Sequence, residues 1–280
     1  MSHALSETDP ADRSDPLSIA VVQRDRDIVR MVEDALCTDR VRLAYQPVFP
    51  AGAPLRPAFY EGLLRILDRT GRAIPAREFI DAVETRETGR VLDCAALDLG
   101  LKALAADPCL RLSVNMSARS IGYPRWSKTL EAGLSRDPRI ARRLILEITE
   151  SSAMLIPDIV TVFMEGLQDR GVSFALDDFG AGFTSFRYLR DFCFDILKID
   201  GQFVRGIAHN PDDQVLARAL VSIAGHFGML SVAESVENAA DAAWLAEAGV
   251  DCLQGYHLAA PSLRPGWVGC DADAGRAVTP

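Results

Sequence analysis

Two adjacent carboxylates, Asp177 and Asp178, follow the apolar run 172–176 and precede a loop that contains two glycines. Neighbouring residues of an extended strand point to opposite sides, so both carboxylates can serve one site only where the strand stops and bends. Two carboxylates about 4 Å apart repel each other by roughly 4 kcal/mol at an effective dielectric constant near 20. A divalent cation is the simplest way to offset this repulsion. Taken alone, the stretch could equally be a turn with an exposed helix cap.

Polar residues also follow most of the other apolar runs of the chain. At or near the carboxyl ends of these runs lie Glu61, Arg65, Asn115, Glu147, Glu150, Lys198, Asp200, Glu234, Glu237 and Gln254. Each of them alone could be a cap or a turn residue, but a shared site explains the whole set better. The oxygen donors suited to a pair of Mg²⁺ or Mn²⁺ ions are Glu61, Asn115, Glu147, Asp177, Asp178 and Glu234.

Two such ions about 3.5–4 Å apart can hold a bridging hydroxide and stabilise the attacking and leaving oxygens of a phosphodiester. Lys198 lies among carboxylates, which favour its charged form, so we expect it to orient the nucleophilic water and to offset negative charge rather than to act as a base. Arg65 offers planar donors for a phosphate, although it could also be an ordinary surface arginine. The histidines are scattered and the six cysteines have no C-x-x-C spacing, which argues against zinc and indicates reduced, mostly buried thiols.

The elements that must position these residues alternate along the chain. Strand-like runs cover Val41–Phe49, Ala58–Ile66, Leu110–Val114, Leu144–Ile148, Val172–Leu176, Ile196–Ile199, Leu230–Ala233 and Val250–Leu253. Helical patterns cover Asp25–Cys37, Ala76–Glu84, Val91–Ala106, Trp126–Leu134, Ile159–Asp169, Asp212–Phe227 and Ala239–Ala248. This rhythm predicts an α/β fold, a TIM-like (β/α)₈ barrel, with an open doubly wound sheet as the alternative. The loop 50–54 is too short for a crossover helix, which favours an antiparallel first strand.

Composition limits the partners of the protein. A net charge of −9 and a pI near 5.0 argue against binding to DNA or RNA polymers. No apolar run approaches the roughly 18–20 residues that span a bilayer, so we expect no membrane segment. The N-terminus has no basic start or apolar signal core, which favours a cytoplasmic protein. We expect a flexible N-terminal tail over 1–24, one domain over 25–268 and a flexible C-terminal tail over 269–280.

The segment Tyr60-Glu61-Gly62-Leu63-Leu64-Arg65 resembles the signature of the EAL-domain phosphodiesterases, which hydrolyse cyclic di-GMP. Further motifs, one before this signature and the others after it, occur in the family's order, and the resemblance covers about residues 25–265. They are Tyr45-Gln46-Pro47-Val48, Ser113-Val-Asn115-Met-Ser117, Glu147-Ile-Thr-Glu150, Asp177-Asp178-Phe-Gly-Ala-Gly182, Leu197-Lys198-Ile-Asp200, Ala233-Glu234-Ser-Val-Glu237 and Gln254-Gly255-Tyr256. Each motif alone is weak, but the ordered set is highly specific.

The resemblance implies a barrel with an antiparallel first strand and a two-metal site that cuts cyclic di-GMP to linear pGpG. By position, one metal would be held by Glu61, Asn115, Glu147 and Asp177. Asp177 would bridge to a second metal held with Asp178 and Glu234, the latter also a proposed general base in this family.

The resemblance also implies roles around the metals. Lys198 and Gln254 would position water, whereas Gln46, Arg65 and Asp200 would face the substrate. Glu150 would steady the loop 179–188, which couples dimerisation to the active site in this family, so a homodimer is expected.

Two departures stand out, because Gly62 replaces the alanine of the naming triplet and Ser235 replaces the family's usual glycine. Neither deletes an expected ligand, so little loss of activity is expected. Two alternatives stay open. One is a module that binds cyclic di-GMP but turns it over slowly. The other, argued from the residues without the family resemblance, is a Mg²⁺-dependent enolising barrel that uses Lys198 as its base.

Overall fold

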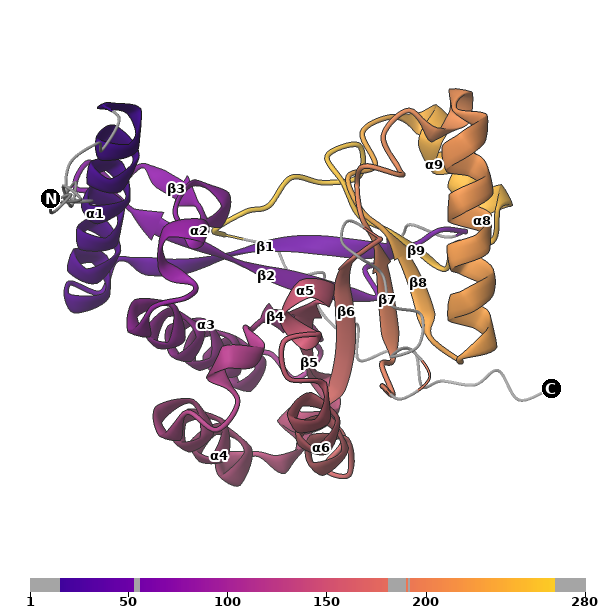
Figure 1. Ribbon diagram of the computed structural model, residues 1–280. Coiled ribbons are helices and arrows are strands. Elements are labelled where there is room, and N and C mark those ends of the chain that lie inside the picture. The colour runs from indigo at the N-terminus through magenta and orange to yellow at the C-terminus, as the bar shows by residue number, and fades with distance from the viewer. Residues whose placement is uncertain (1–15, 53–55, 181–189, 191, 265–280) are drawn as a thin grey trace, which may run out of the picture.

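Eight strands form a closed barrel at the centre of the computed structural model, which describes residues 16–52, 56–180, 190 and 192–264 (Figure 1). They are β1 (Val41–Pro50), β2 (Phe59–Leu67), β4 (Leu112–Asn115), β5 (Leu144–Thr149), β6 (Ser173–Phe179), β7 (Ile196–Ile199), β8 (Leu230–Ala233) and β9 (Cys252–Leu253). Their order is β1-β9-β8-β7-β6-β5-β4-β2, and a β1–β2 pairing closes the ring. The predicted barrel is therefore confirmed, and the open sheet is excluded.

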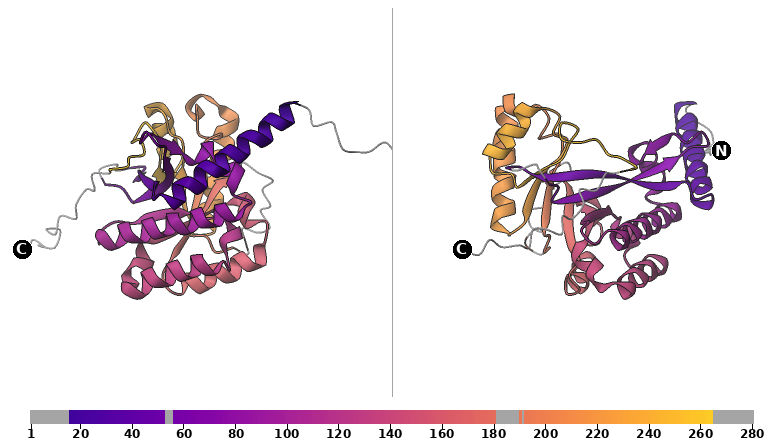
Figure 2. Two further views of the ribbon diagram at one scale, coloured as in Figure 1. Left: turned by 90° about the vertical axis from the view of Figure 1, so that its left-hand side faces the viewer. Right: turned by 180° about the vertical axis from the view of Figure 1, so that it is seen from behind.

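Strand β1 runs antiparallel to both of its neighbours, β2 and β9, as the short connection to β2 predicted. The other neighbouring strands of the barrel pair in parallel. A further short strand, β3 (Ala73–Pro75), pairs with the outer end of β2 and was not predicted. β1 and β2 are long enough to reach from the barrel to the first helix (Figure 2).

Helices flank the barrel, and apart from α1 and the short α2 and α5 their bounds lie close to the sequence expectations. They are α1 (Pro16–Cys37), α2 (Ile80–Val83), α3 (Glu87–Ala106), α4 (Pro124–Arg136), α5 (Glu150–Ala153), α6 (Pro157–Gln168), α8 (Pro211–His226) and α9 (Ala239–Glu247). The 3₁₀ segments are η1 (Ala76–Glu78), η2 (Ala118–Ser120), η3 (Pro138–Arg143) and η4 (Ile207–His209). Local capping explains several starts; the Asn210 side chain, for example, accepts hydrogen bonds from the first backbone amides of α8.

The N-terminal helix is longer than the sequence pattern indicated. α1 begins at Pro16, so residues 16–24, expected to belong to a flexible tail, are helical. Val32 and Ala35, near its C-terminal end, are fully buried and anchor the helix. Residues 1–15 and the C-terminal tail expected over 269–280 lie outside the described residues.

The thiols differ in part from expectation. Cys94 and Cys252 are buried and free, whereas Cys37 and Cys193 are free but exposed. Cys109 is disulfide-bonded, so the prediction of reduced thiols is wrong at this position.

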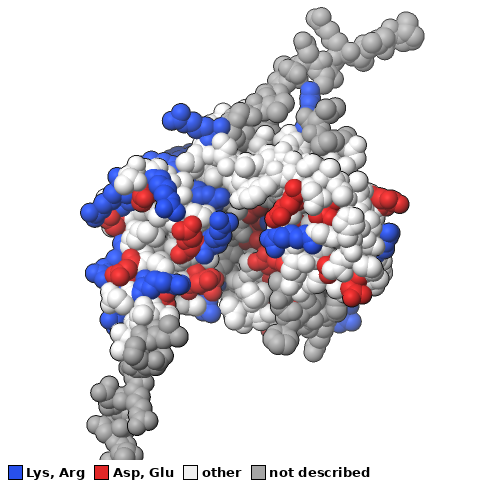
Figure 3. All heavy atoms as spheres, turned by 90° about the horizontal axis from the view of Figure 1, so that it is seen from above, with Lys and Arg blue, Asp and Glu red and all other residues white. Residues whose placement is uncertain are grey.

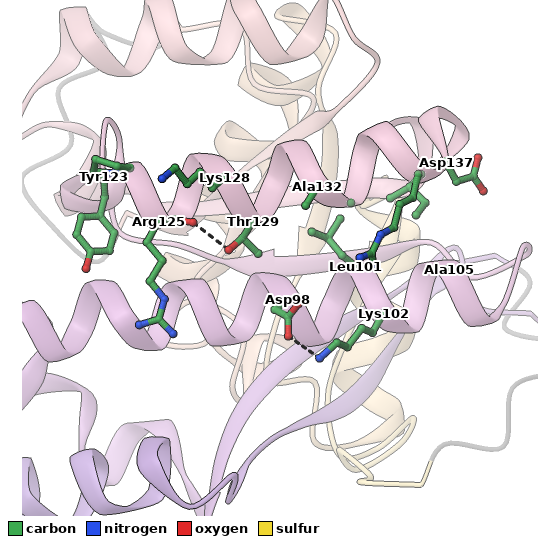
Figure 4. Close-up of a pocket in the computed structure, with 14 residues that line it drawn as sticks. Asp98, Leu101, Lys102, Ala105, Tyr123, Arg125, Lys128, Thr129, Ala132 and Asp137 are labelled. Carbon is green, nitrogen blue, oxygen red and sulfur yellow. Dashed lines mark hydrogen bonds and ion pairs between the residues drawn. The ribbon is translucent and has the colours of Figure 1, made fainter.

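A groove of about 700 Å³ lies between α3 and α4 on the outside of the barrel (Figure 4). Leu101 and Ile140 contribute apolar surface, and Lys102 and Arg125 are among its basic residues. None of the residues expected to form the active site lines this groove, so it is separate from the chemistry described below.

Candidate active site

The site residues form one layer inside the barrel. A layer of apolar side chains fills the interior of the barrel beneath them, formed by Val48, Phe59, Ile145, Ala175, Ile196, Val232 and Cys252. Residues two apart on a strand point to the same side. The next inward-facing layer, two residues further toward the barrel mouth, therefore contains Gln46, Glu61, Glu147, Asp177, Lys198, Glu234 and Gln254. An apolar floor thus supports a polar layer at the carboxyl ends of the parallel strands, where barrel enzymes build their sites.

A bulge in β6 brings the two adjacent carboxylates to the same site. The pairing of β6 with β7 shifts register between Leu176 and Phe179, and Asp178 has a left-handed backbone with a φ of 54°. This bend turns Asp178 toward the side on which Asp177 already lies. The expectation that both carboxylates require a bent strand is therefore confirmed, although the bend lies within the strand rather than after its end.

Lys198 lies at the centre of the carboxylates. Its Nζ is 2.6 Å from Glu234, 2.7 Å from Glu147, 2.9 Å from Asp177 and 3.3 Å from Glu61. Burial alone would lower the pKa of Lys198, but the four carboxylates raise it well above its ordinary value. Lys198 is therefore a cation and not a neutral base, which removes the main support for the enolising alternative.

Amide side chains hold Glu61 in place. Asn115 Nδ2 donates to one carboxylate oxygen of Glu61 at 2.9 Å, and Gln254 Nε2 donates to the other at 2.6 Å. Gln254 Nε2 also lies 3.2 Å from Gln46 Oε1, and Gln46 in turn donates to the Ala259 carbonyl at 3.1 Å. Burial opposes ionisation of Glu61, but Lys198 and these amides lower its pKa below the ordinary value.

Glu147, Asp178 and Glu234 hold protons more tightly than usual. Burial, together with Glu61 and Asp177, raises the pKa of Glu147 to about 8 despite the nearby Lys198. Burial and the charge of Asp177 raise the pKa of Asp178 to about 6. Burial also raises the pKa of Glu234 well above its ordinary value. One ammonium does not balance five carboxylates, so this site favours additional positive charge.

The donor set fits two divalent cations. Oxygens of Glu61, Glu147 and Asp177 lie within 4.8 Å of one another, and so do oxygens of Asp177, Asp178 and Glu234. Asp177 is common to both groups. Glu147 Oε1 is buried and has no hydrogen-bond partner within the described ranges, so it can accept a cation without losing a protein contact. Oxygen-rich sites of this kind suit Mg²⁺ or Mn²⁺.

Three expected site residues lie outside this cluster. Glu150, at the start of α5, accepts a hydrogen bond from Gly180 N at 3.1 Å, so it contacts the beginning of the loop 179–188. Residues 181–188 of that loop lie outside the described residues. Asp200 lies beside Asp178, raises its pKa and accepts a hydrogen bond from Gln202 N at 2.7 Å. Arg65 lines the mouth of the site and donates to its neighbouring Leu64 carbonyl.

The barrel mouth holds a cavity of about 400 Å³ above the carboxylates. Figure 3 looks onto this face, where acidic side chains gather in a central hollow and basic side chains lie beside it. Arg77 and Arg205 line the cavity with Arg65, and sequence reasoning missed both. They follow the ends of short strands at no distinctive spacing, so the sequence held no signal for them.

A smaller cavity of about 280 Å³ continues from the carboxylates toward α3. Its lining includes Gly62, Asn115 and Asp93, a buried residue of α3.

Fold and site together define a barrel protein with a buried acidic site at its mouth. The chain belongs to the EAL domain family, whose model matches residues 29–261. It is 32% identical over 240 residues to cyclic di-GMP phosphodiesterase PdeB of Shewanella oneidensis, an alignment that covers 82% of this chain and 27% of that protein. It is 30% identical over 237 residues to the probable cyclic di-GMP phosphodiesterase PdeN of Escherichia coli, covering 83% of this chain and 45% of that protein. The chain thus spans less than half the length of these curated relatives.

Solved structures agree on the fold. A structure described as "PaMucR Phosphodiesterase, c-di-GMP complex" superposes with a TM-score of 0.73 at 30% identity, covering 84% of this chain and 97% of that chain. The EAL domain of FimX from Pseudomonas aeruginosa, bound to c-di-GMP, superposes with a TM-score of 0.77 at 27% identity, covering 85% of this chain and 97% of that chain.

Within the described residues, no helix combines the length and the apolar character that crossing a membrane requires.

Proposed function

We propose that the protein is a two-metal phosphodiesterase that hydrolyses cyclic di-GMP to linear pGpG. The observation that carries this proposal is that two sets of three carboxylate residues have Asp177 in common. Two cations that share a ligand lie close together, as a two-metal phosphodiesterase requires. The names of PdeB and PdeN and the nucleotide in the two superposed structures support cyclic di-GMP as the substrate. The enzyme would lower the concentration of this bacterial second messenger in the cytoplasm.

Each side chain of the layer has a proposed place. Glu61, Asn115, Glu147 and Asp177 would hold the first Mg²⁺ or Mn²⁺ ion, and Asp177, Asp178 and Glu234 the second. When bound, the ions would activate a water molecule and stabilise negative charge on the attacking and leaving oxygens. We assign Glu234 to the second ion rather than to proton transfer, because a carboxylate that binds a cation is a poor base.

The other residues orient the reactants. Lys198 and Gln254 would hold the attacking water, because both lie among the carboxylates and carry N–H donors. Gln46 and Arg65 line the mouth and would bind the nucleotide. Hydrolysis adds the water oxygen to phosphorus, breaks the bond to the 3′ oxygen and places a proton on that oxygen, which leaves a 5′-phosphate on pGpG.

We also propose that the protein acts as a homodimer. Leu155, Ile159 and Val162, in and just before α6, are 54%, 54% and 70% exposed. Ile159 and Val162 lie three positions apart on α6, and Leu155 lies two residues before that helix. Together they offer an apolar surface that a second copy of the chain could bury. The face adjoins α5, where Glu150 contacts the loop that begins at Gly180, so dimerisation and the site would be coupled through α5.

Turnover of cyclic di-GMP by the purified chain tests the proposal. With Mg²⁺ or Mn²⁺ we expect pGpG as the product, and we expect EDTA or Glu61→Ala to abolish it. Tight binding of cyclic di-GMP without product, with either metal and at high protein concentration, would instead support the second candidate, a receptor that binds the nucleotide. Neither binding nor turnover would refute the substrate.

A further inference from the structure

We propose that Arg205 binds the phosphodiester of the substrate that is not being cleaved, and that Ser235 positions Arg205 for this contact. This inference rests on the function proposed above and adds a residue pair that sequence reasoning did not assign to the site. The two residues lie on different segments, the turn after β7 and the turn after β8, and both line the mouth cavity.

The barrel topology places Arg205 across the mouth from the other arginines. Three strands separate β7 from β2 in either direction round the ring, namely β6, β5 and β4 one way and β8, β9 and β1 the other. Arg65 lies in β2, and Arg77 lies in η1, just beyond it. Arg205, six residues past the end of β7, is therefore on the opposite rim. Among the described residues that line the cavity, these three arginines are the cationic ones.

The substrate requires positive charge at two places. Cyclic di-GMP carries two phosphodiesters, and only one of them can lie at the carboxylate floor with the metal ions. The second phosphodiester must lie nearer the rim. Glu237 lines the cavity there, and its negative charge would repel a phosphodiester that has no cationic partner. A guanidinium group matches phosphate oxygens in shape and charge, so an arginine on the rim meets this requirement.

Arg205 is held in position but keeps a free donor edge. Its Nη2 donates to Ser235 Oγ at 3.0 Å, and its Nε lies 3.4 Å from Glu237 Oε1. No hydrogen bond from Nη1 is found within the described part of the chain. The guanidinium thus has two contacts on one edge and a free nitrogen on the other. This arrangement suits an arginine that binds a ligand, because a side chain that is already ordered loses less conformational entropy on binding.

Ser235 adopts a costly backbone conformation at this point. Its φ is 54°, in the left-handed region that favours glycine, so the serine side chain is kept at a cost in folding free energy. Gly201 makes room for it, since a Cβ at position 201 would lie only 2.5 Å from Ser235 Oγ and 3.1 Å from Arg205 Nη2. Strain of this kind is typical of functional sites. Within the described part of the chain, the hydrogen bond that Ser235 Oγ accepts is the one from Arg205, which gives the serine its role.

Steady-state kinetics on three single variants test the pair. Arg205→Ala should raise KM for cyclic di-GMP about tenfold with kcat changed less than about threefold, as expected for one lost charge-assisted hydrogen bond. Ser235→Gly should raise KM about threefold and should also raise the melting temperature, because the strain is removed. The double variant should be no worse than Arg205→Ala. Arg218→Ala is the matched control, because Arg218 stacks on Trp244 on the outside of the barrel.

A second substrate separates phosphate binding from a general structural role. Bis(4-nitrophenyl) phosphate has one phosphodiester, so Arg205→Ala should lower the ratio of kcat/KM for cyclic di-GMP to kcat/KM for this compound about tenfold. An unchanged ratio for Arg205→Ala would overturn the proposal. So would a KM for cyclic di-GMP that is unchanged in both Arg205→Ala and Ser235→Gly.

A direct binding measurement covers the case in which the wild-type chain shows no turnover. Dissociation constants for cyclic di-GMP are then measured in EDTA for the same variants. Weaker binding by Arg205→Ala than by Arg218→Ala would support the inference even if the chain does not hydrolyse cyclic di-GMP. Equal binding, or no binding by the wild type, would overturn it.

Discussion

Nζ of Lys198 lies 2.7 Å from Oε2 of Glu147, and both side chains are almost completely buried. The two residues belong to β7 and β5, which β6 separates in the sheet, so the contact crosses the interior of the barrel. Three more carboxylates surround the same ammonium. Lys198 therefore provides the fixed positive charge around which the acidic layer is built.

Replacing Lys198 should reveal this role in stability as well as in turnover. Lys198→Met should lower the free energy of unfolding by about 3–5 kcal/mol without added metal, because it leaves buried carboxylates unpaired. Mg²⁺ should restore part of the loss in melting temperature. In contrast, kcat should stay at least about a hundredfold below wild type even at saturating metal, since the group proposed to orient the water is gone. Thermal unfolding and turnover with and without Mg²⁺ measure both effects.

Lys102→Met is the matched control for that experiment. Lys102 pairs with Asp98 at 2.7 Å, but the side chains are 68% and 50% exposed. Removing an exposed pair should change the free energy of unfolding by less than about 1 kcal/mol. Equal losses in the two lysine variants would contradict a central role for Lys198.

The glycine in the family triplet should be nearly neutral to substitution. A Cβ at Gly62 would lie 3.2 Å from a methyl group of Leu43 and 3.2 Å from the Ser113 carbonyl, a tight but adjustable fit. Gly62→Ala should change the free energy of unfolding by less than about 1 kcal/mol, because the reduced freedom of the unfolded chain offsets the crowding. Turnover should change less than threefold, on the order of 0.6 kcal/mol.

Gly255 provides the contrast. A Cβ there would lie 2.1 Å from the Val236 carbonyl oxygen and 2.3 Å from its amide nitrogen, so backbone must move. Gly255→Ala should displace Gln254 and Glu234, which adjoin these two segments, and lower kcat at least about tenfold.

For Gly62→Ala, a large gain in activity would contradict the expected near-neutral effect and show that the missing methyl group limits turnover by this chain.

Much of the layer could be predicted because strand periodicity and barrel topology act together. Glu61, Glu147, Lys198 and Glu234 each follow an apolar inward-facing residue by two positions, so the pattern alone placed them on one level. Asp177 and Asp178 were harder, because a regular strand would separate them. The sequence indicated the bend but not that a bulge inside β6 produces it.

Contacts between turns could not be predicted in the same way. Arg205 meets Ser235 through two turns whose paths depend on the surrounding packing, and nothing in local spacing relates positions 205 and 235. The start of α1 at Pro16 was also not predicted. Ile19, Val21 and Val22 in this part of the helix are exposed, so it buries no apolar face against the rest of the chain.

Asp93 should make stability depend on pH. This buried residue accepts hydrogen bonds from Ser117 N at 3.0 Å and Ser120 Oγ at 2.5 Å, yet burial raises its pKa to about 7. The folded state therefore keeps a proton that the unfolded chain loses near pH 4. The stabilising contribution is complete below about pH 4 and is lost as pH rises through about 7.

Asp93→Asn keeps a hydrogen-bond acceptor and removes the charge. Relative to wild type, its free energy of unfolding should be about 2 kcal/mol higher at pH 8 than at pH 5, because only the wild type must ionise a buried carboxyl group. Denaturant titrations at the two pH values measure the difference. The same relative stability at both values would show that Asp93 has an ordinary pKa.

The proposed dimer face can be tested with one charge. Val162→Glu places a carboxylate on the apolar face of α6 and should convert a dimer to a monomer and reduce turnover, because an unpaired charge cannot be buried without a large cost. Val215→Glu is the control, since Val215 is similarly exposed at 68% but lies on α8. Light scattering after size-exclusion chromatography gives the mass. A wild-type monomer, or a dimer that survives Val162→Glu, would refute the proposed interface.

The most direct test of the two-metal site is an anomalous difference map from crystals of the chain grown with Mn²⁺. We predict two peaks about 4 Å apart, one beside Glu61, Glu147 and Asp177 and the other beside Asp177, Asp178 and Glu234. A single peak, or two peaks without Asp177 between them, would contradict the account.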